Sequence, residues 1–154
     1  MQRKPQIGVM GPGRVDGTGR ELAHEVGRLI AEAGCVLVCG GLGGAMEAAA
    51  RGACEAGGVV IGILPGASHA DANPYITHII ATGMGHARNC INILSSHAII
   101  AVQGEYGTLS EIALALKCGK PVVGLHTWDL AAAGCRDPNF HIAETPAGAV
   151  KSVK

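Results

Sequence analysis

The residues best suited to chemistry lie in one stretch, where Gly104, Gly107 and Thr108 are followed by Glu111. The apolar run 98–102 precedes them, and an apolar run without polar alternation predicts a strand buried on both faces, as in a parallel sheet. A glycine turn between such a strand and a helix presents backbone N–H groups at the positive end of the helix dipole. The stretch therefore predicts an anion-binding turn with a carboxylate close behind it.

Two further glycine turns follow apolar runs. Gly11 and Gly13 follow the first run, and four glycines lie within positions 40–44. Removing every Cβ from a surface lets a flat or phosphorylated ligand approach the backbone. For the second turn the alternative is that glycines only allow close packing of a helix on the sheet. The first turn is either a simple connector or a ligand loop with Arg14 and Asp16 at its rim.

Arg88 is the cation most closely associated with these turns. It stands near the start of a helix expected over residues 87–96. An arginine in a first helical turn opposes the preference of the helix dipole, so it requires a specific partner. That partner is either an anionic ligand or a carboxylate of the protein.

The elements that must position these residues alternate along the chain. Short apolar strands and moderately long helices predict a single domain over 1–154, with a three-layer αβα Rossmann-like fold and a mostly parallel sheet. Thr18 and Glu21 have the spacing of a capping box for the first helix. Ligands of such sheets bind beyond the carboxyl ends of the strands, so the three turns should converge on one crevice. The expected strands are 7–10, 36–38, 59–64, 98–102 and 122–125, with an edge segment at 75–80 and a final helix at 146–153.

Composition narrows the partners. Lys plus Arg and Asp plus Glu number 12 each, so no field of one sign favours nucleic acid or a membrane surface. No apolar run approaches the roughly 20 residues that span a bilayer, and a cytoplasmic protein is expected. Charged residues are only 16% of the chain, which predicts a homodimer or homotetramer that covers part of its surface. The apolar residues 112–116 are the expected interface.

Cysteine and histidine patterns give no metal site. The six cysteines include no CxxC pair, and the seven histidines include no HExxH spacing. Cysteines in such a chain are expected to be small buried hydrophobes. The first turn is also not GxGxxG, Cys39-Gly40 stands where an NAD site has an acidic residue, and no GKS or GKT occurs. A dinucleotide dehydrogenase and a P-loop NTPase are therefore rejected.

Two motifs carry a family resemblance. GEYGTLSE at 104–111 resembles PGGxGTxxE, the hallmark of the LOG (Lonely Guy) superfamily, whose members were once misnamed lysine decarboxylases. CGGLGGAM at 39–46 resembles the second hallmark GGGxxGxM, and Arg88 corresponds to the family's arginine on the helix before the hallmark strand. The resemblance runs from about 7 to 125. The short chain and the sequence YGTLSEIALAL are most similar to those of a branch of small nucleotide-binding proteins that includes molybdenum cofactor carrier proteins.

The resemblance implies roles for individual residues. Superfamily enzymes hydrolyse the N-glycosidic bond of nucleoside 5′-monophosphates, which makes Arg88 and Glu111 the candidate catalytic residues. Glu111 would stay ionised beside the helix dipole and stabilise an oxocarbenium-like centre, while Arg88 would neutralise phosphate or position Glu111. The candidate ligand- and phosphate-binding residues are Gly11, Gly13, Gly40, Gly41, Gly43, Gly44, Met46, Gly104, Glu105, Tyr106, Gly107 and Thr108.

Departures from the family's residues argue against catalysis more than they argue against ligand binding. Gln103 and Glu105 stand where the family has Pro and Gly, and Asn89 stands where the enzymes have Lys. Thr108 and Glu111 also have capping-box spacing, which gives Glu111 a purely structural alternative.

The sequence thus predicts a binding protein for a phosphorylated, nucleotide-like ligand, with the pterin phosphate of molybdenum cofactor as one candidate. A phosphoribohydrolase is the alternative. No cofactor is required, and the candidate bound molecules are a nucleotide, phosphate or molybdenum cofactor.

Overall fold

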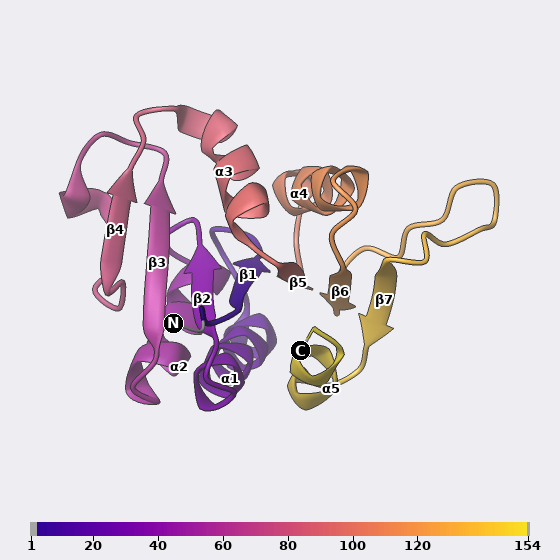
Figure 1. The fold of residues 1–154 in the computed structure, drawn as a ribbon, viewed down its shortest axis with the longest axis horizontal. Coiled ribbons are helices and arrows are strands. Elements are labelled where there is room, and N and C mark those ends of the chain that lie inside the picture. The colour runs from indigo at the N-terminus through magenta and orange to yellow at the C-terminus, as the bar shows by residue number, and fades with distance from the viewer. Residues whose placement is uncertain (1–2, 154) are drawn as a thin grey trace.

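The computed structural model describes residues 3–153 and contains one seven-stranded sheet in the order β4-β3-β2-β1-β5-β6-β7 (Figure 1). All six pairings between neighbouring strands are parallel, so the predicted α/β Rossmann-like fold is confirmed. The strand order reverses between β1 and β5, which is where ligands bind in sheets of this kind. The strands are β1 (Gln6–Met10), β2 (Val36–Cys39), β3 (Val59–Leu64), β4 (His78–Ala81), β5 (Ala98–Val102), β6 (Val122–Leu125) and β7 (Phe140–Ala143).

Helices cover both faces of the sheet and complete the three layers. In Figure 1, α1, α2 and α5 lie on one side and α3 and α4 on the other. The α-helices are α1 (Gly17–Glu32), α2 (Ala45–Glu55), α3 (Arg88–Ser95), α4 (Tyr106–Lys117) and α5 (Pro146–Ser152), with 3₁₀ turns η1 (His69–Asp71) and η2 (Gly85–Ala87).

Two apolar clusters form the core, one on each side of the sheet. The larger contains side chains of α1, α2 and α5, and the smaller contains Ile93 of α3 and Ile112 of α4. All five residues of β5 are buried, as expected for a strand covered on both faces. The sheet thereby holds the ends of β1 and β5 rigidly beside each other.

Glycines let α1 and α2 pack unusually closely. An added Cβ at Gly27 would lie 1.9 Å from the carbonyl oxygen of Ala49, and one at Gly52 would lie 1.9 Å from that of His24. The alternative considered for the second turn was packing of a helix on the sheet, whereas these contacts, made by glycines within the helices, join α1 to α2.

Two predicted capping boxes are wrong. The N-cap of α1 is Asp16, whose Oδ1 accepts a hydrogen bond from the Gly19 amide at 2.7 Å, and Thr18 lies within the first turn. The N-cap position of α4 is occupied by Glu105, so Thr108 is the third residue of the helix. Glu111 therefore cannot reach back to an N-cap at Thr108, and its structural alternative as a capping-box residue fails.

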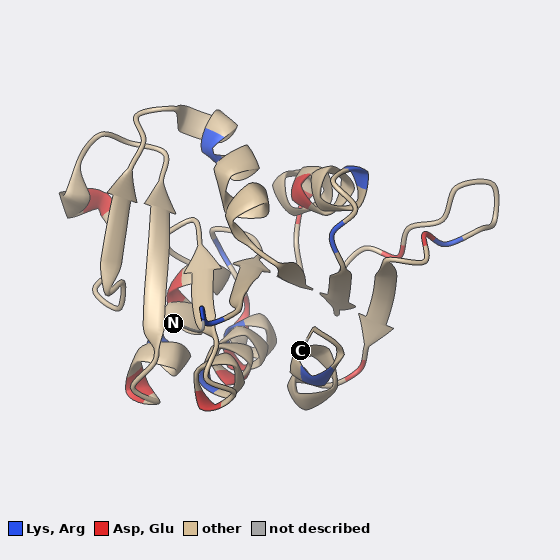
Figure 2. Cartoon of the chain, in the orientation of Figure 1, with Lys and Arg blue, Asp and Glu red and all other residues tan. Residues whose placement is uncertain are grey.

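Other local expectations were partly met. The final helix was predicted, whereas β7 was not, and the expected edge segment at 75–80 forms a strand only from His78. Cys35 and Cys39 are buried, but the other four cysteines are exposed, so the expectation of buried cysteines holds for two. Residues of both charges lie along α1 and α2, as Figure 2 shows. Within residues 3–153 no helix has the length and apolarity to span a bilayer.

Candidate functional site

A cavity of about 220 Å³ lies at the carboxyl ends of β1, β2 and β5. Its walls come from the turns after these strands and from the first turns of α3 and α4. The fold therefore brings the three glycine turns to one place, at the strand-order reversal. The lining residues are Val9, Met10, Gly11, Pro12, Gly13, Gly40, Met46, His86, Arg88, Asn89, Glu105, Gly107, Thr108 and Glu111.

Five of the sequence-predicted residues do not line this cavity: Gly41, Gly43, Gly44, Gly104 and Tyr106. Gly44 instead joins the first two turns, because its φ is +66° and an added Cβ would lie 2.3 Å from the Pro12 carbonyl oxygen. Tyr106 is 79% exposed and points out of the cavity's lining. These positions shape the turns or flank the site.

Five lining residues were absent from the predicted set: Val9, Met10, Pro12, His86 and Asn89. Val9 and Met10 end the first strand, where only the following glycines were considered. His86 and Asn89 lie near Arg88 in the sequence. Gly83 and Gly85 precede them, and this pair of glycines was the signal that could have predicted a further turn lining the cavity.

Arg88 is held at the first residue of α3 and is only 8% exposed. Its Nη1 donates to Asn89 Oδ1, its Nη2 lies 3.5 Å from the Gly40 carbonyl oxygen, and its Nε has no partner in the described structure. Burial lowers the pKa of Arg88, and the nearby Glu111 and Cys39 oppose that shift. The guanidinium nevertheless remains a cation at neutral pH, because arginine starts from a very high pKa. It presents unused donor capacity beside the cavity.

Glu111 lies in the second turn of α4 and is 7% exposed. Burial raises its pKa to about 7, although the positive charge of Arg88 acts in the opposite direction. Desolvation outweighs the favourable charge of Arg88, so this carboxyl group is less readily ionised than its place beside the helix dipole suggested. Among residues 3–153 it forms no hydrogen bond or ion pair with Arg88. A carboxyl group near half-ionisation faces the cavity.

Asn92 adds an unexpected polar group behind Arg88. It lies one helical turn further along α3 and is fully buried, and neither its Oδ1 nor its Nδ2 has a partner among the described residues. Buried polar groups are normally hydrogen-bonded, so the Asn92 amide and the Arg88 Nε leave hydrogen-bonding capacity unused within the first turns of α3.

The turn after β5 is fixed from several sides. Gln103 has φ +51°, which proline cannot adopt, so the departure from the hallmark has a conformational reason. Its side chain donates to Asp16 Oδ1 at 3.0 Å and so connects this turn to the N-cap of α1. The indole N–H of Trp128 donates to the Glu105 carbonyl at 3.2 Å, and the Trp128 and Tyr106 rings lie 5.7 Å apart.

Side-chain caps distinguish the helices that face the cavity from the others. Asp16 and Thr145 cap α1 and α5 through their side chains. Within the described chain no side chain caps α2, α3 or α4. At α2 the Ala45 amide donates to the Pro12 carbonyl, and at α3 the Arg88 amide donates to carbonyls of η2, so the helix start best suited to an anionic ligand is that of α4. The same residues contain no group of three or more His, Cys, Asp or Glu side chains placed to hold a metal ion.

Comparisons with known proteins agree with this architecture. An uncharacterised protein of Archaeoglobus fulgidus is 54% identical over 120 residues, which cover 78% of this chain and 79% of that protein. The structure of a molybdenum cofactor binding protein from the phototrophic bacterium Rippkaea orientalis is 42% identical, with a TM-score of 0.92 over 99% of this chain and 97% of its own. A molybdenum cofactor carrier protein from Chlamydomonas reinhardtii is 43% identical, with a TM-score of 0.88 over 98% and 96% of the two chains.

These similarities confirm the resemblance to the LOG superfamily and to its branch of molybdenum cofactor carriers. The DNA processing protein A of Streptococcus pneumoniae, at 18% identity and a TM-score of 0.76, shares the fold alone. The model of the SLOG cluster4 family matches residues 4–150, and the chain belongs to that family.

Proposed function

We propose that this protein binds a phosphorylated, nucleotide-like ligand and carries the pterin phosphate of molybdenum cofactor. The observation that supports it most directly is Arg88, a nearly buried guanidinium with an unpartnered Nε, at a cavity that also includes the start of α4, which no side chain of the described residues caps. A buried cation without a carboxylate partner gains most from an anion placed against it.

The first turn of α4 supplies the second part of a phosphate site. Gly107 lines the cavity, and an added Cβ there would meet nothing within 4 Å. A phosphate oxygen can therefore approach the backbone N–H groups of this turn at the positive end of the dipole. Glu105 also lines the cavity and opposes the bound charge, so the site favours a ligand that offers that carboxylate a donor.

The choice of cargo is supported by the relatives. Proteins described as binding or carrying molybdenum cofactor are 41–43% identical to this chain over nearly its whole length. The metal belongs to that cargo, and this chain's part is to hold the phosphate and shield the ring system.

Binding by the Arg88 variants tests the proposal. Arg88→Ala, and Arg88→Met as a variant that preserves volume, should weaken phosphate and nucleoside 5′-monophosphate affinity about tenfold or more in calorimetry, because a charge-assisted hydrogen bond is lost. Lys117→Ala, at the exposed end of α4, is the matched control and should bind like the wild type. After loading with molybdenum cofactor and gel filtration, metal analysis should find more molybdenum retained by the wild type and the control than by the Arg88 variants. Unchanged affinity in both Arg88 variants would remove Arg88 from the site.

A phosphoribohydrolase is the second candidate, favoured by one observation. Glu111 is a cavity-lining carboxyl with a pKa of about 7, which suits general acid–base chemistry. A panel of nucleoside 5′-monophosphates should be tested for release of free base with wild type and Glu111→Gln. Release by the wild type alone would establish the hydrolase, whereas binding without release by either protein favours the carrier.

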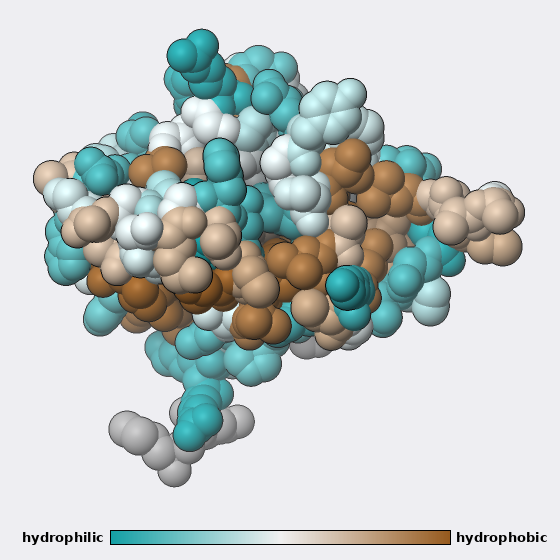
Figure 3. Space-filling model, turned by 90° about the horizontal axis from the view of Figure 1, so that it is seen from above, coloured by the Kyte–Doolittle hydropathy of each residue, from teal (hydrophilic) through white to brown (hydrophobic). Residues whose placement is uncertain are grey.

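We also propose a cytoplasmic homodimer or homotetramer. All six cysteines are free, which is typical of proteins in a reducing compartment. Figure 3, which views the molecule from the side of α3 and α4, shows apolar side chains across this face. Leu94 of α3 is 60% exposed there, and Ala113 of the predicted interface segment is exposed beside the half-buried Leu114 and Leu116.

A further inference from the structure

A second and larger cavity adjoins the anion site. It has a volume of about 850 Å³ and lies between the first halves of α1 and α2. Gly13 lines both cavities, so the two spaces meet at the turn after β1. We call the larger space the α1–α2 groove; its lining includes Gly13, Glu21, Gly44, Glu47, Arg51 and Tyr75.

The anion cavity is too small to hold a whole nucleotide-like ligand. Its volume of about 220 Å³ lies below the range of about 300–1,000 Å³ typical of sites for whole small molecules. It suits a phosphate head, so the remainder of a nucleotide-like ligand must continue into adjoining space. The α1–α2 groove is large enough and shares Gly13 with the anion cavity.

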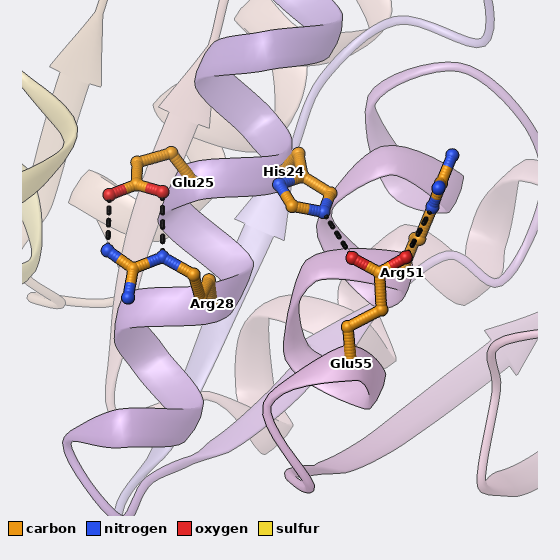
Figure 4. A network of polar contacts seen from close by, with 5 residues as sticks. All are labelled: His24, Glu25, Arg28, Arg51 and Glu55. Atoms are coloured by element: carbon orange, nitrogen blue, oxygen red, sulfur yellow. Dashed lines mark hydrogen bonds and ion pairs between the residues drawn. The ribbon is translucent and has the colours of Figure 1, made fainter.

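Three of the titratable groups that line the groove, His24, Glu25 and Arg51, are paired, whereas Arg14, Arg20, Glu21 and Glu47 form no ion pair among residues 3–153. Figure 4 shows Glu55 bridging the two helices, with one carboxylate oxygen 2.8 Å from His24 Nε2 and the other 2.7 Å from Arg51 Nε. Glu25 is paired with Arg28 through two hydrogen bonds. These pairs fix the walls and leave two arginines and two carboxylates of the lining available to a ligand.

Glu47 is the half-buried one of these four unpaired groups, whereas Arg14, Arg20 and Glu21 are exposed. It is half-buried in the first turn of α2, and within residues 3–153 its carboxylate makes no hydrogen bond or ion pair. Its Oε2 lies 3.9 Å from the position that a Cβ on Gly43 would take, next to the Gly13 carbonyl. Glu21, the other unpartnered carboxylate of the groove, is exposed on the α1 side.

We propose that the α1–α2 groove holds the ring system of the ligand and that Glu47 selects a ring with a ring N–H beside an exocyclic amino group. This inference rests on the proposed function of phosphorylated-ligand binding. A carboxylate only accepts hydrogen bonds and takes two parallel N–H donors in a bidentate pair. Guanine and pterins offer such an edge, whereas adenine places an acceptor beside its amino group. Tyr75, half-buried with Arg51 at 6.0 Å from its ring centre, adds an aromatic wall.

The test compares GMP, AMP and inorganic phosphate by calorimetry and by the fluorescence of Trp128, the single tryptophan of the chain. GMP should bind the wild type at least about tenfold more tightly than AMP, since two charge-assisted hydrogen bonds distinguish them. Glu47→Gln should remove that preference and leave AMP and phosphate affinity unchanged. Glu144→Gln, an exposed carboxylate outside both cavities, is its control.

Blocking the junction gives an independent readout. Gly13 does not have a positive φ, and an added Cβ there would meet nothing within 4 Å, so Gly13→Val should fold normally. It should weaken both nucleotides at least about tenfold more than it weakens phosphate, because only the larger ligands cross the junction. Gly17→Val is the matched control, since an added Cβ at Gly17 also meets nothing and Gly17 lines neither cavity.

The outcomes separate the two proposals. A wild type that binds neither phosphate nor nucleotides would overturn the proposed function. A wild type that binds GMP and AMP equally, with both affinities unchanged by Gly13→Val and Glu47→Gln, would leave that function standing and overturn this inference. Loss of nucleotide binding in Tyr106→Ala alone would likewise overturn it, by putting the ring on the opposite side of the anion cavity.

Discussion

At the scale of single residues, the site combines an arginine that stays positively charged at neutral pH with a carboxyl group whose ionisation changes near neutral pH. Arg88 stays protonated, while burial brings the pKa of Glu111 to about 7. An anion bound beside them would favour the neutral form of Glu111 and so raise its pKa further. Binding of phosphate should therefore take up protons near neutral pH.

The first prediction concerns the pH dependence of stability. The pKa of Glu111 is about 7 when folded, against an ordinary value of 4.5, so the folded state binds more protons than the unfolded state between these values. The free energy of unfolding should consequently fall as pH rises from about 4.5 to 7, by up to about 3 kcal/mol from this group, and stay reduced above that range.

Urea denaturation of wild type and Glu111→Gln at pH 5 and pH 8 measures that contribution. The variant should lose less stability than the wild type between the two pH values, because glutamine does not titrate. Parallel losses in the two proteins would contradict a raised pKa at this residue.

At the scale of elements, two devices hold the site: the cap of α1 and the close contact of α1 with α2. Asp16 caps α1 and also receives Gln103 from the turn after β5, so one carboxylate connects two walls of the site. Hydrogen bonds from Gly19 and Gln103 lower the pKa of Asp16. The α1–α2 contact depends on backbone approach that no side chain would allow.

The N-cap assignment gives a second prediction. Asp16→Ala should lower the melting temperature by roughly 2–5 °C, because the Gly19 amide loses its acceptor and Gln103 loses its anchor. Thr18→Ala should change it by less than about 1 °C, since Thr18 is exposed and is not the cap. A larger effect at Thr18 than at Asp16 would restore the capping box that the sequence suggested.

The third prediction tests the contact between the helices. Gly27→Ala should reduce the free energy of unfolding by about 1–3 kcal/mol, because its methyl group would meet the backbone carbonyl of Ala49. Gly17→Ala, where the methyl group meets nothing, should be neutral or slightly stabilising. Denaturant midpoints for the two variants measure the difference, and equal midpoints would mean that the helices separate at little cost.

At the scale of the whole molecule, the two faces of the sheet differ in what their helices expose. The α1 and α2 layer carries paired charges of both signs, whereas the α3 and α4 face exposes Met84 and Leu94 at 51% and 60%. Apolar side chains gathered on one face are typical of surfaces that another protein covers. A second copy of the chain is the partner that the low content of charged residues predicts.

The fourth prediction follows for the assembly. The wild type should sediment as a dimer or tetramer at micromolar concentration, and Leu94→Glu should shift it toward the monomer, because a charge in an apolar interface is costly to desolvate. Ala147→Glu, an exposed position on α5 in the opposite layer, should leave the mass unchanged. A monomeric wild type would contradict the proposed interface.

The sequence by itself determined the order of elements up to β6 and the place of the site. Apolar runs as short as Ala98–Val102 are typical of strands buried on both faces, and the glycine turns after them follow from the same pattern. Arg88 was identifiable because its position opposes the helix dipole, and Gly107 and Glu111 because their spacing matches a hallmark. These are local signals, carried by neighbours in the chain.

Tertiary structure decided what depends on residues distant in sequence. The cap of α1 went to Asp16, which also receives Gln103 from 87 positions away, rather than to the better local motif at Thr18. The pKa of Glu111 reflects burial, which no spacing records, and Asn92 became notable only because packing left its amide without a partner. The α1–α2 groove likewise exists because two helices meet at Gly27 and Gly52. Desolvation and long-range contact are properties of the packed chain, and only the fold could supply them.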